Sequence, residues 1–422
     1  MQKALRFLLA AFLLVAPFPS SAGSRATLLL VAAALLAADA IRTREWPWPP
    51  MPRGFLLAAM AWIALCAASL LWSTKPAYSW EELQREAGYG ALAFALFFAA
   101  TRETADLRAF VWASLTGTVL LGIAAWLARL LPPMVLTDRY LAIEGYFSTQ
   151  IVLAAPLLVI VASKGRFGLG RSLGVATSVA LLLAAAAFAT ENRMMWIALA
   201  AALACIAFAY RRGGEAFLRV PSRKAFALAL AAMALGFAAS SAYKATRYFP
   251  DSSTTESFSF DERPLIWDIA GDLFDQRPWL GHGYGREILG DAVSDGAARR
   301  GSPHPLILRH GHNVFIDAAL QMGVAGLAAF AALFAALFMA FVQASRVKEA
   351  WPLATAGMAM IVAYTAKNLT DDFFYRPNSL VFWACCGMLL GLAARFRPTV
   401  AAPAKRPAAA DGPATGIRAP SA

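Results

Sequence analysis

The sequence predicts an all-α polytopic membrane protein with about twelve transmembrane helices and one large loop outside the membrane. Of its 422 residues, 59% are hydrophobic and only 15% are charged, and the mean hydropathy is +0.55. The apolar residues form blocks of about 15–25 with almost no charge inside, and a helix needs about 20 such residues to cross the hydrocarbon layer. Uninterrupted apolar blocks exclude a membrane β-barrel, whose strands alternate apolar and polar residues over about ten positions.

Each apolar block is expected to form one span, and the first two are short enough to form a hairpin. The approximate bounds are 4–19, 26–41, 54–72, 87–101, 109–131, 149–163, 173–189, 194–210, 225–242, 313–344, 352–369 and 379–395. The chain therefore divides into spans one to nine (1–242), a large outer loop with candidate site residues (243–312), spans ten to twelve (313–395) and a tail (396–422). The tail is biased toward Ala, Pro and Gly, which predicts a disordered cytoplasmic segment.

The basic residues indicate how the chain is oriented. The formal net charge is +12, and the lysines and arginines are spread over the links between apolar blocks. With the N-terminus in the cytoplasm, links that carry Arg42 and Arg44, or Arg211 and Arg212, lie on the cytoplasmic side, as the positive-inside rule requires. Both termini are then cytoplasmic. No basic tract or aromatic-basic module occurs, so a nucleic-acid partner is not expected.

Two further features of composition have simple interpretations. The start of the chain has a basic lead, an apolar stretch and a Ser-Ser-Ala sequence, which also fits a cleaved signal peptide. We expect an uncleaved first span, because further membrane segments follow at once. The four cysteines all lie inside apolar blocks, where they are expected to be small core residues without disulfide or metal partners.

Two of the four histidines, His310 and His312, lie where the loop meets the tenth span. At the N-terminus of that helix the dipole disfavours imidazolium and keeps a ring neutral, which is the form a general base needs. Capping of the helix by His312 or Asn313 is the simpler alternative. A zinc site formed by His304, His310 and His312 is a third, but the loop offers no cysteine and no known ligand spacing. We therefore expect no metal.

The spacing of residues around His312 resembles a known signature. His312-Asn313, nine residues, Gly323, two residues and Gly326 is similar to the His-Asn motif of the bacterial O-antigen ligase family, within the wider ligase and polymerase superfamily. The glycines also have a plain alternative role, since small residues let membrane helices approach closely.

Two arginines strengthen this resemblance. Arg193 stands at the start of the eighth span, in "TENRMMWIAL", and Arg263 stands at the start of the loop's first predicted helix, in "DERPLIW". The family keeps arginines at both places, and the resemblance implies that they contact the pyrophosphate of a lipid-linked donor. A snorkelling anchor is the ordinary interpretation of an arginine at the end of a span.

The remaining candidates lie in two short segments. "RPWLGHGYG" resembles the superfamily's Pro-x-x-Gly-x-Gly-x-Gly stretch, whose glycines would form a tight turn and whose neighbours Tyr284 and Arg286 would line or support the site. In "TDDFFYRP", Asp371 or Asp372 would orient His312 or bind sugar hydroxyls, although we favour a solvated turn. The candidate substrate-binding residues are Arg193, Arg263, Tyr284, Arg286, Asn313 and Asp371.

The resemblance implies a glycosyltransferase of the C type in the bacterial inner membrane, with its active site facing the periplasm. The implied donor is O-antigen polysaccharide on undecaprenyl pyrophosphate, and the implied acceptor is a sugar hydroxyl of lipid A-core. His312 would deprotonate the acceptor, while Arg193 and Arg263 would stabilise the leaving diphosphate. Such an inverting transfer needs neither a metal nor another cofactor, and its partners are these two lipids within the membrane.

Two other functions remain open. An O-antigen polymerase would use the same donor, but polymerases more often divide their catalytic arginines between two outer loops. A secondary transporter would show broken helices and buried ionisable residues near the middle of the bilayer. The spans here have almost no such residues, which favours the ligase.

Overall fold

The computed structural model describes residues 1–130, 144–163, 173–190, 192–214, 223–248, 263–302, 308–370 and 372–396. The regular elements in these ranges are helices, and no strand occurs there. His304, Asp371 and residues 397–422 of the predicted tail lie outside the described residues.

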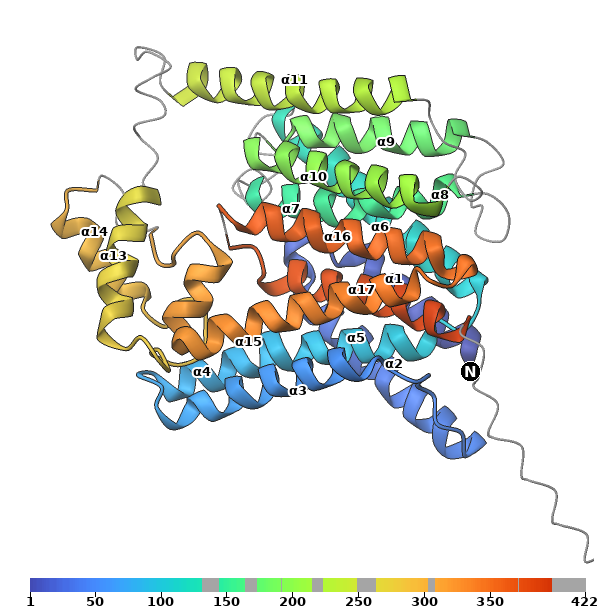
Figure 1. The fold of residues 1–422 in the computed structure, drawn as a ribbon, viewed down its shortest axis with the longest axis horizontal. Helices are drawn as coiled ribbons and strands as arrows, with labels where there is room; N and C mark the ends of the chain where they lie inside the picture. The colour runs from blue at the N-terminus through green and yellow to red at the C-terminus, as the bar shows by residue number, and fades with distance from the viewer. Residues whose placement is uncertain are drawn as a thin grey trace, which may run out of the picture.

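The helices follow one another with short links (Figure 1). They are α1 (Gln2–Val15), α2 (Ala22–Thr43), α3 (Arg53–Ala68), α4 (Pro76–Glu82), α5 (Tyr89–Ala100), α6 (Thr104–Leu130), α7 (Glu144–Ala154), α8 (Leu158–Ala162), α9 (Leu173–Phe188), α10 (Arg193–Ala209), α11 (Arg223–Tyr248), α13 (Arg263–Gln276), α14 (Gly290–Arg299), α15 (Val314–Ala344), α16 (Trp351–Asn368) and α17 (Arg376–Arg395). A π-helical turn, Leu83–Gly88, joins α4 to α5.

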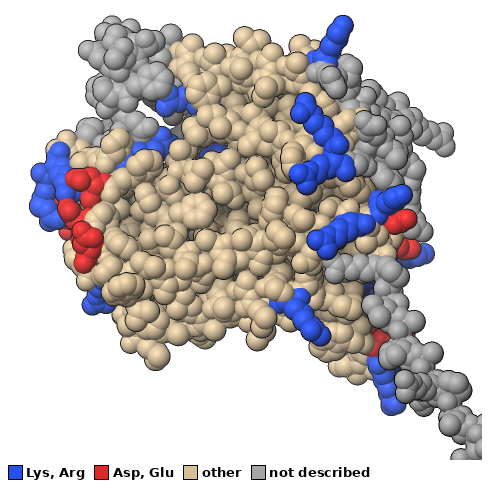
Figure 2. Space-filling view, in the orientation of Figure 1, with Lys and Arg blue, Asp and Glu red and all other residues tan. Residues whose placement is uncertain are grey.

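The predicted class, a polytopic helical membrane protein, is confirmed. Seven segments of the described chain are long and apolar enough to cross a membrane: Pro19–Thr43, Arg53–Leu71, Thr104–Leu127, Arg193–Arg212, Phe226–Tyr243, Val314–Ala344 and Arg376–Arg395. The count of twelve spans stays a prediction. Figure 2 shows a broad uncharged band across this face, with mainly lysines and arginines and a few acidic side chains at one edge, and a compact cluster of both signs at the other.

Helix α17 is the centre of the bundle and is buried along its length between α5 and α16. Its glycines permit this contact: a Cβ added at Gly387 would lie 2.5 Å from the carbonyl oxygen of Phe94, and one at Gly391 would overlap the carbonyl oxygen of Phe98. Small residues let helices approach closely where both faces are apolar. The loop helices α13 and α14 lie beyond one end of the bundle, the end at which α15 and α17 both begin (Figure 1).

Helix α15 is broken inside its apolar sequence, at the first glycine of the His-Asn motif. Gly323 has φ +64° and ψ −159°, and the break frees backbone groups on both sides of it. The loop segment 278–283 pairs with these groups: the Val324 N–H donates to the Pro278 carbonyl (2.8 Å), and the Gly283 N–H donates to the Gln321 carbonyl (2.8 Å). Freed backbone groups at membrane depth must find such partners. Gly323 therefore serves to dock the loop into the helix.

The glycine-rich loop forms the predicted tight turn. Gly281, Gly283 and Gly285 have φ values of +64°, +114° and +132°, which side chains other than glycine rarely adopt. A Cβ at Gly281 would lie 2.5 Å from the backbone of Gln321, so the turn also needs glycine for its close approach to α15.

Candidate active site

The candidate site is assembled where the loop enters α15. Asn313 is the N-cap of this helix: its Oδ1 accepts the N–H of Phe315 at 2.9 Å, and its Nδ2 donates to the Leu369 carbonyl at 2.8 Å. Unpaired N–H groups at a helix start are satisfied by such side chains. The capping role predicted as an alternative is thus confirmed for Asn313, which also ties α15 to the end of α16.

His312 directly precedes this cap and is half-buried. Its φ is +48°, a left-handed conformation that is uncommon for a residue other than glycine. Its ring lies against that of His310, with centroids 4.0 Å apart. Backbone strain of this kind costs free energy and persists where the surroundings fix it, and it clusters at functional sites.

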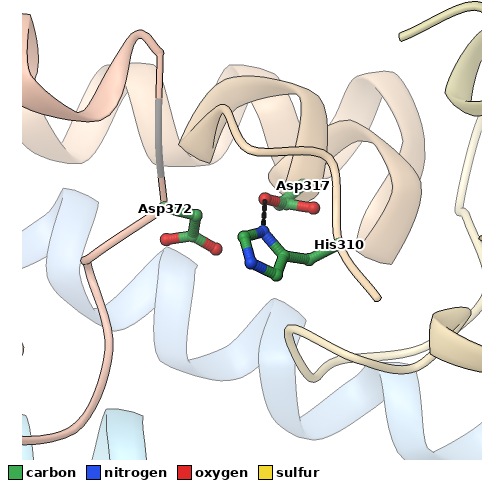
Figure 3. Close-up of side chains that lie close together, drawn as sticks. All are labelled: His310, Asp317 and Asp372. Carbon is green, nitrogen blue, oxygen red and sulfur yellow. Dashed lines mark ion pairs between the residues drawn. The ribbon is translucent and has the colours of Figure 1, made fainter. Parts of the chain in front are cut away.

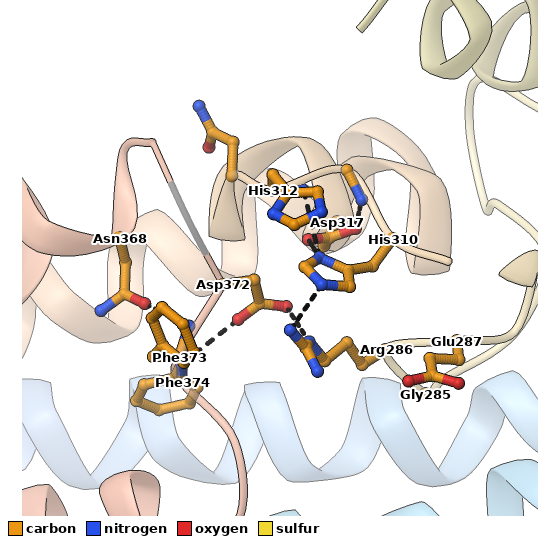
Figure 4. Close-up of polar contacts among 12 residues, drawn as sticks. Gly285, Arg286, Glu287, His310, His312, Asp317, Asn368, Asp372, Phe373 and Phe374 are labelled. Atoms are coloured by element: carbon orange, nitrogen blue, oxygen red, sulfur yellow. Dashed lines mark hydrogen bonds and ion pairs between the residues drawn. The ribbon is translucent and has the colours of Figure 1, made fainter. Parts of the chain in front are cut away.

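His310 lies between His312 and Arg286 (Figure 4). Arg286 Nη2 is 2.7 Å from His310 Nε2, and its Nε is 3.3 Å from Asp372 Oδ2. Asp372 is only 3% exposed, so the solvated turn that we favoured for this residue is wrong. Burial raises the pKa of the Asp372 carboxyl to about 6, and the guanidinium of Arg286 opposes that shift.

Two N–H donors face the His310 ring, Arg286 Nη2 at Nε2 and the His312 amide at Nδ1 (3.1 Å). A neutral imidazole has one acceptor nitrogen, so only one of these contacts is a hydrogen bond in a given tautomer. The shorter contact with the charged arginine favours Nε2 as the acceptor. The ring proton then lies on Nδ1, which is 3.8 Å from Asp317 Oδ2.

Asp317 lies one turn into α15 and is buried (Figure 3). Its Oδ1 accepts the Gly311 N–H at 2.6 Å, which fixes the backbone just before His312. One ligand atom each of His310, Asp317 and Asp372 lies within 4.8 Å of the other two, a spacing suited to a metal ion. Arg286 already places its cation against His310 and Asp372, so a metal ion would have to displace it.

The predicted arginines stand at the helix starts expected for them. Arg263 is the first residue of α13, and one turn later Trp267 Nε1 donates to the Gly311 carbonyl at 2.9 Å, which brings α13 against the histidine segment. Arg193 is the first residue of α10, whose N-cap is Asn192. Helix α10 packs along α16, and it begins at the end of the bundle on which the loop helices lie (Figure 1).

A second buried cluster lies beside Arg286 and was missed by the sequence analysis. Arg376 Nη2 donates to Glu82 Oε1 at 2.7 Å, and the Arg376 N–H donates to Glu86 Oε2 at 3.0 Å. The Tyr375 ring connects the two clusters, because the guanidinium carbons of Arg286 and Arg376 lie 4.9 and 4.3 Å from its centroid. The only sequence signal was a pair of glutamates four residues apart just before an apolar block.

These two clusters line one pocket, to which the first contributes Arg286 and the second contributes Glu86 and Tyr375. The side chains that border it include Trp62, Glu82, Glu86, Tyr284, Asp372 and Tyr375. Tyr284, a predicted substrate-binding residue, is buried in its wall, and its ring meets Trp62 edge-on with centroids 6.2 Å apart. The structure thus brings His312, Arg286, Tyr284 and Asn313 to one region.

Comparison with known proteins supports the resemblance drawn from the motifs. Residues 178–331 match the family model described as O-Antigen ligase, and this range contains Arg193, Arg263 and the whole His312–Gly326 motif. The predicted family is therefore confirmed over this part of the chain. No curated protein matches the sequence.

Proposed function

We propose that this protein is a membrane glycosyltransferase that transfers O-antigen polysaccharide from undecaprenyl pyrophosphate to a sugar hydroxyl of lipid A-core. The observation that carries the proposal is the placement of His312 at the mouth of the broken helix α15, with α13 docked beside it through Trp267. This constellation lies inside the segment that matches the O-antigen ligase family.

His312 is the proposed general base. His312 is half-buried as a residue, whereas His310 is 8% exposed and held by Arg286. His310 and Asp317 would keep the His312 backbone and ring in place, because Asp317 binds the Gly311 N–H and the two imidazole rings lie against each other. A positioned base that takes the acceptor proton contributes about 10²–10⁴-fold to the rate.

Arg193 and Arg263 are the proposed ligands of the donor diphosphate. Each stands at a helix N-terminus, where backbone N–H groups and the helix dipole also favour an anion. Guanidinium groups bind phosphate oxygens in pairs and stay charged, so they would stabilise the leaving diphosphate as the glycosidic bond breaks. Attack by the acceptor from the opposite side inverts the anomeric centre.

In this proposal the active site faces the periplasm, and the protein lies in the bacterial inner membrane with both termini in the cytoplasm. The support is the charge pattern: charged side chains of both signs gather over the loop helices, and lysines and arginines gather at the opposite edge (Figure 2). Both lipid substrates would then approach from the outer leaflet.

A deletion strain tests the proposed reaction. If the protein is a ligase, the strain accumulates polymerised lipid-linked glycan and, separately, lipid A-core without polymer. Lipid A-core that carries a single repeat unit would instead identify a polymerase. Normal lipopolysaccharide in the deletion strain would contradict both activities.

A further inference from the structure

We infer that the pocket bordered by Glu82, Glu86 and Tyr375 is the subsite for the acceptor sugar of the glycosyl transfer. The inference rests on the proposed function and adds residues outside the family-matched segment, Glu82 and Glu86 before it and Tyr375 after it. The ligand it names is a neutral, polyhydroxylated sugar that presents one hydroxyl toward the histidine pair.

The two glutamates provide acceptors for sugar hydroxyls. Glu82 is 1% exposed, and its Oε2 is buried without a hydrogen-bond partner among the described residues. Its other oxygen binds Arg376 at 2.7 Å, which fixes the direction of the carboxyl group. A buried acceptor without a partner costs free energy, so such an atom is expected where a ligand supplies the missing donor. A sugar hydroxyl is a donor of suitable size.

The walls of the pocket suit the remaining faces of a sugar ring. Trp62, Tyr284 and Tyr375 present aromatic surfaces, which pack against the C–H faces of a pyranose and exclude water. Gln321 adds an amide group at the rim, and its Oε1 accepts the Gly285 N–H at 3.0 Å. Apolar and aromatic walls with a few fixed polar groups are the usual composition of a small-molecule site.

The charges of the pocket favour a neutral ligand over a diphosphate. Arg286 and Arg376 are opposed by Glu82 and Asp372. Burial raises the pKa of Glu86 to about 8, so near neutral pH this fifth group is mostly protonated and adds little negative charge to the pocket. A diphosphate would meet carboxylates here, whereas Arg193 and Arg263 offer it helix N-termini. The two substrates therefore have separate binding regions.

The position of the pocket fits attack by an acceptor. Arg286 and Asp372 form part of its wall, and Arg286 contacts His310, whose ring lies against that of His312. The pocket therefore lies on the Arg286 side of the histidine pair, with His310 nearer to it than His312. Helix α13, which carries Arg263, approaches the same pair through Trp267 and Gly311.

An apolar groove adjoins the pocket and shares Trp62, Glu86 and Tyr284 with it. Leu56 and Met60 of α3 line this groove and are 42% and 58% exposed on the surface of a membrane-spanning helix. A lipid-anchored acceptor can therefore reach the pocket sideways, from within the bilayer.

The test compares Glu82→Gln with Glu81→Gln in purified protein. Glu81 is the preceding residue, lies half exposed and pairs with Arg85 on the surface, so it is a matched control. Initial transfer rates are measured against lipid A-core at saturating lipid-linked glycan, and then in the reverse arrangement. We expect Glu82→Gln to raise the KM for the acceptor about ten-fold or more with an unchanged KM for the donor. Glu81→Gln should match the wild type in both.

An increased KM for the donor in place of the acceptor, or no change in either, would overturn the inference. If Glu82→Gln does not fold, Trp62→Phe and Glu82→Asp serve as the test. The first keeps an aromatic ring of smaller size, and the second keeps a carboxyl group on a shorter side chain. Both should raise the KM for the acceptor alone. A wild-type protein that transfers no glycan to lipid A-core would refute the proposed function itself, which distinguishes the two failures.

Discussion

The histidines at the mouth of α15 differ in their surroundings although only one residue separates them. His310 is buried and contacts Arg286, while His312 is half-buried and adopts a left-handed backbone conformation. Asp317 holds the intervening Gly311 by its N–H. A buried ring in contact with a guanidinium is suited to positioning, and a ring held on a strained backbone is suited to proton transfer.

His312→Ala should lower the rate of transfer at least about 100-fold, because a positioned general base contributes that much or more. The measurement is the initial rate of glycan transfer to lipid A-core by purified protein. The melting temperature of the variant is measured alongside, so that a loss of folding is distinguished from the loss of a base. Normal transfer by the variant would exclude His312 as the base.

Arg263→Lys should lose nearly as much activity as Arg263→Ala. A lysine keeps the charge but offers a single ammonium group, whereas a guanidinium binds two phosphate oxygens at once. Both variants are compared with the wild type in single-turnover transfer at saturating acceptor. Full activity of the lysine variant would show that charge alone suffices and that paired hydrogen bonds are not required.

Glu86 should make stability depend on pH. Its pKa is raised from the usual value of 4.5 to about 8, chiefly by burial, so the protonated carboxyl stabilises the fold below pH 4.5 and this contribution is lost as pH rises through 8. We expect the wild type to lose on the order of 2–4 kcal/mol between pH 5 and pH 8.5 relative to Glu86→Gln. Melting temperatures of both proteins over this range provide the measurement, and parallel pH profiles would contradict the assignment.

At the scale of elements, the break in α15 explains the spacing of the His-Asn motif. The first half of the helix carries Asp317 and Gln321 and is capped by Asn313. Gly323 follows it and, lacking a Cβ, leaves room for the loop backbone at Trp279. The loop that carries Tyr284 and Arg286 is thereby fixed at one position along α15, and hence relative to His312 at the start of that helix. Backbone hydrogen bonds therefore hold the glycine-rich loop against α15, and most side-chain substitutions leave these bonds in place.

Gly323→Ala should therefore destabilise the protein by about 2 kcal/mol or more. Its φ of +64° with ψ of −159° is a conformation essentially restricted to glycine, and an added Cβ would overlap the carbonyl carbon of Trp279. Thermal unfolding and protease sensitivity of the loop are the measurements. Gly271→Ala, in α13 with open space around the position, is the control and should be neutral or slightly stabilising. An equally stable Gly323→Ala would contradict the docking role.

Periodicity and caps could be predicted from sequence because they depend on neighbouring residues. The apolar blocks predicted the helices, and the residue types at 312–313 predicted a helix start that the Asn313 cap confirms. The burial of Asp372, the pairing of Glu82 with Arg376 and the break at Gly323 all depend on segments distant in the chain. Each of these is a tertiary contact, and no local pattern of residue types specifies its partner.

At the scale of the whole molecule, the polar chemistry lies at one end of the bundle. The loop helices, the histidine segment and the pocket are all at the end where α15 and α17 begin (Figure 1). At the other end, Arg395 donates to the carbonyls of Gly391 and Ala99 at 2.8 and 2.9 Å and holds α17 against α5. The uncharged band between the two ends fits a bilayer, so in the proposed orientation the end that carries the candidate site and the end that carries Arg395 would face opposite compartments.

This orientation can be measured by cysteine labelling in spheroplasts. Ala298, in α14 of the loop, and Glu349, in the link between α15 and α16, are both exposed and lie at opposite ends of the bundle. A Cys205→Ala background suits both substitutions, because the other three native cysteines are buried.

Ala298→Cys should react with a membrane-impermeant maleimide in intact spheroplasts, and Glu349→Cys should react only after the membrane is permeabilised. The positive-inside rule predicts this result, since Arg346 and Lys348 shortly precede Glu349, and each basic residue in a short link favours the cytoplasmic side. The opposite labelling pattern would place His312 in the cytoplasm, where the proposed acceptor lipid would have to be assembled before export. Labelling of both sites without permeabilisation would show that the uncharged band does not span the bilayer, because a membrane-impermeant reagent reaches only one side of an intact membrane.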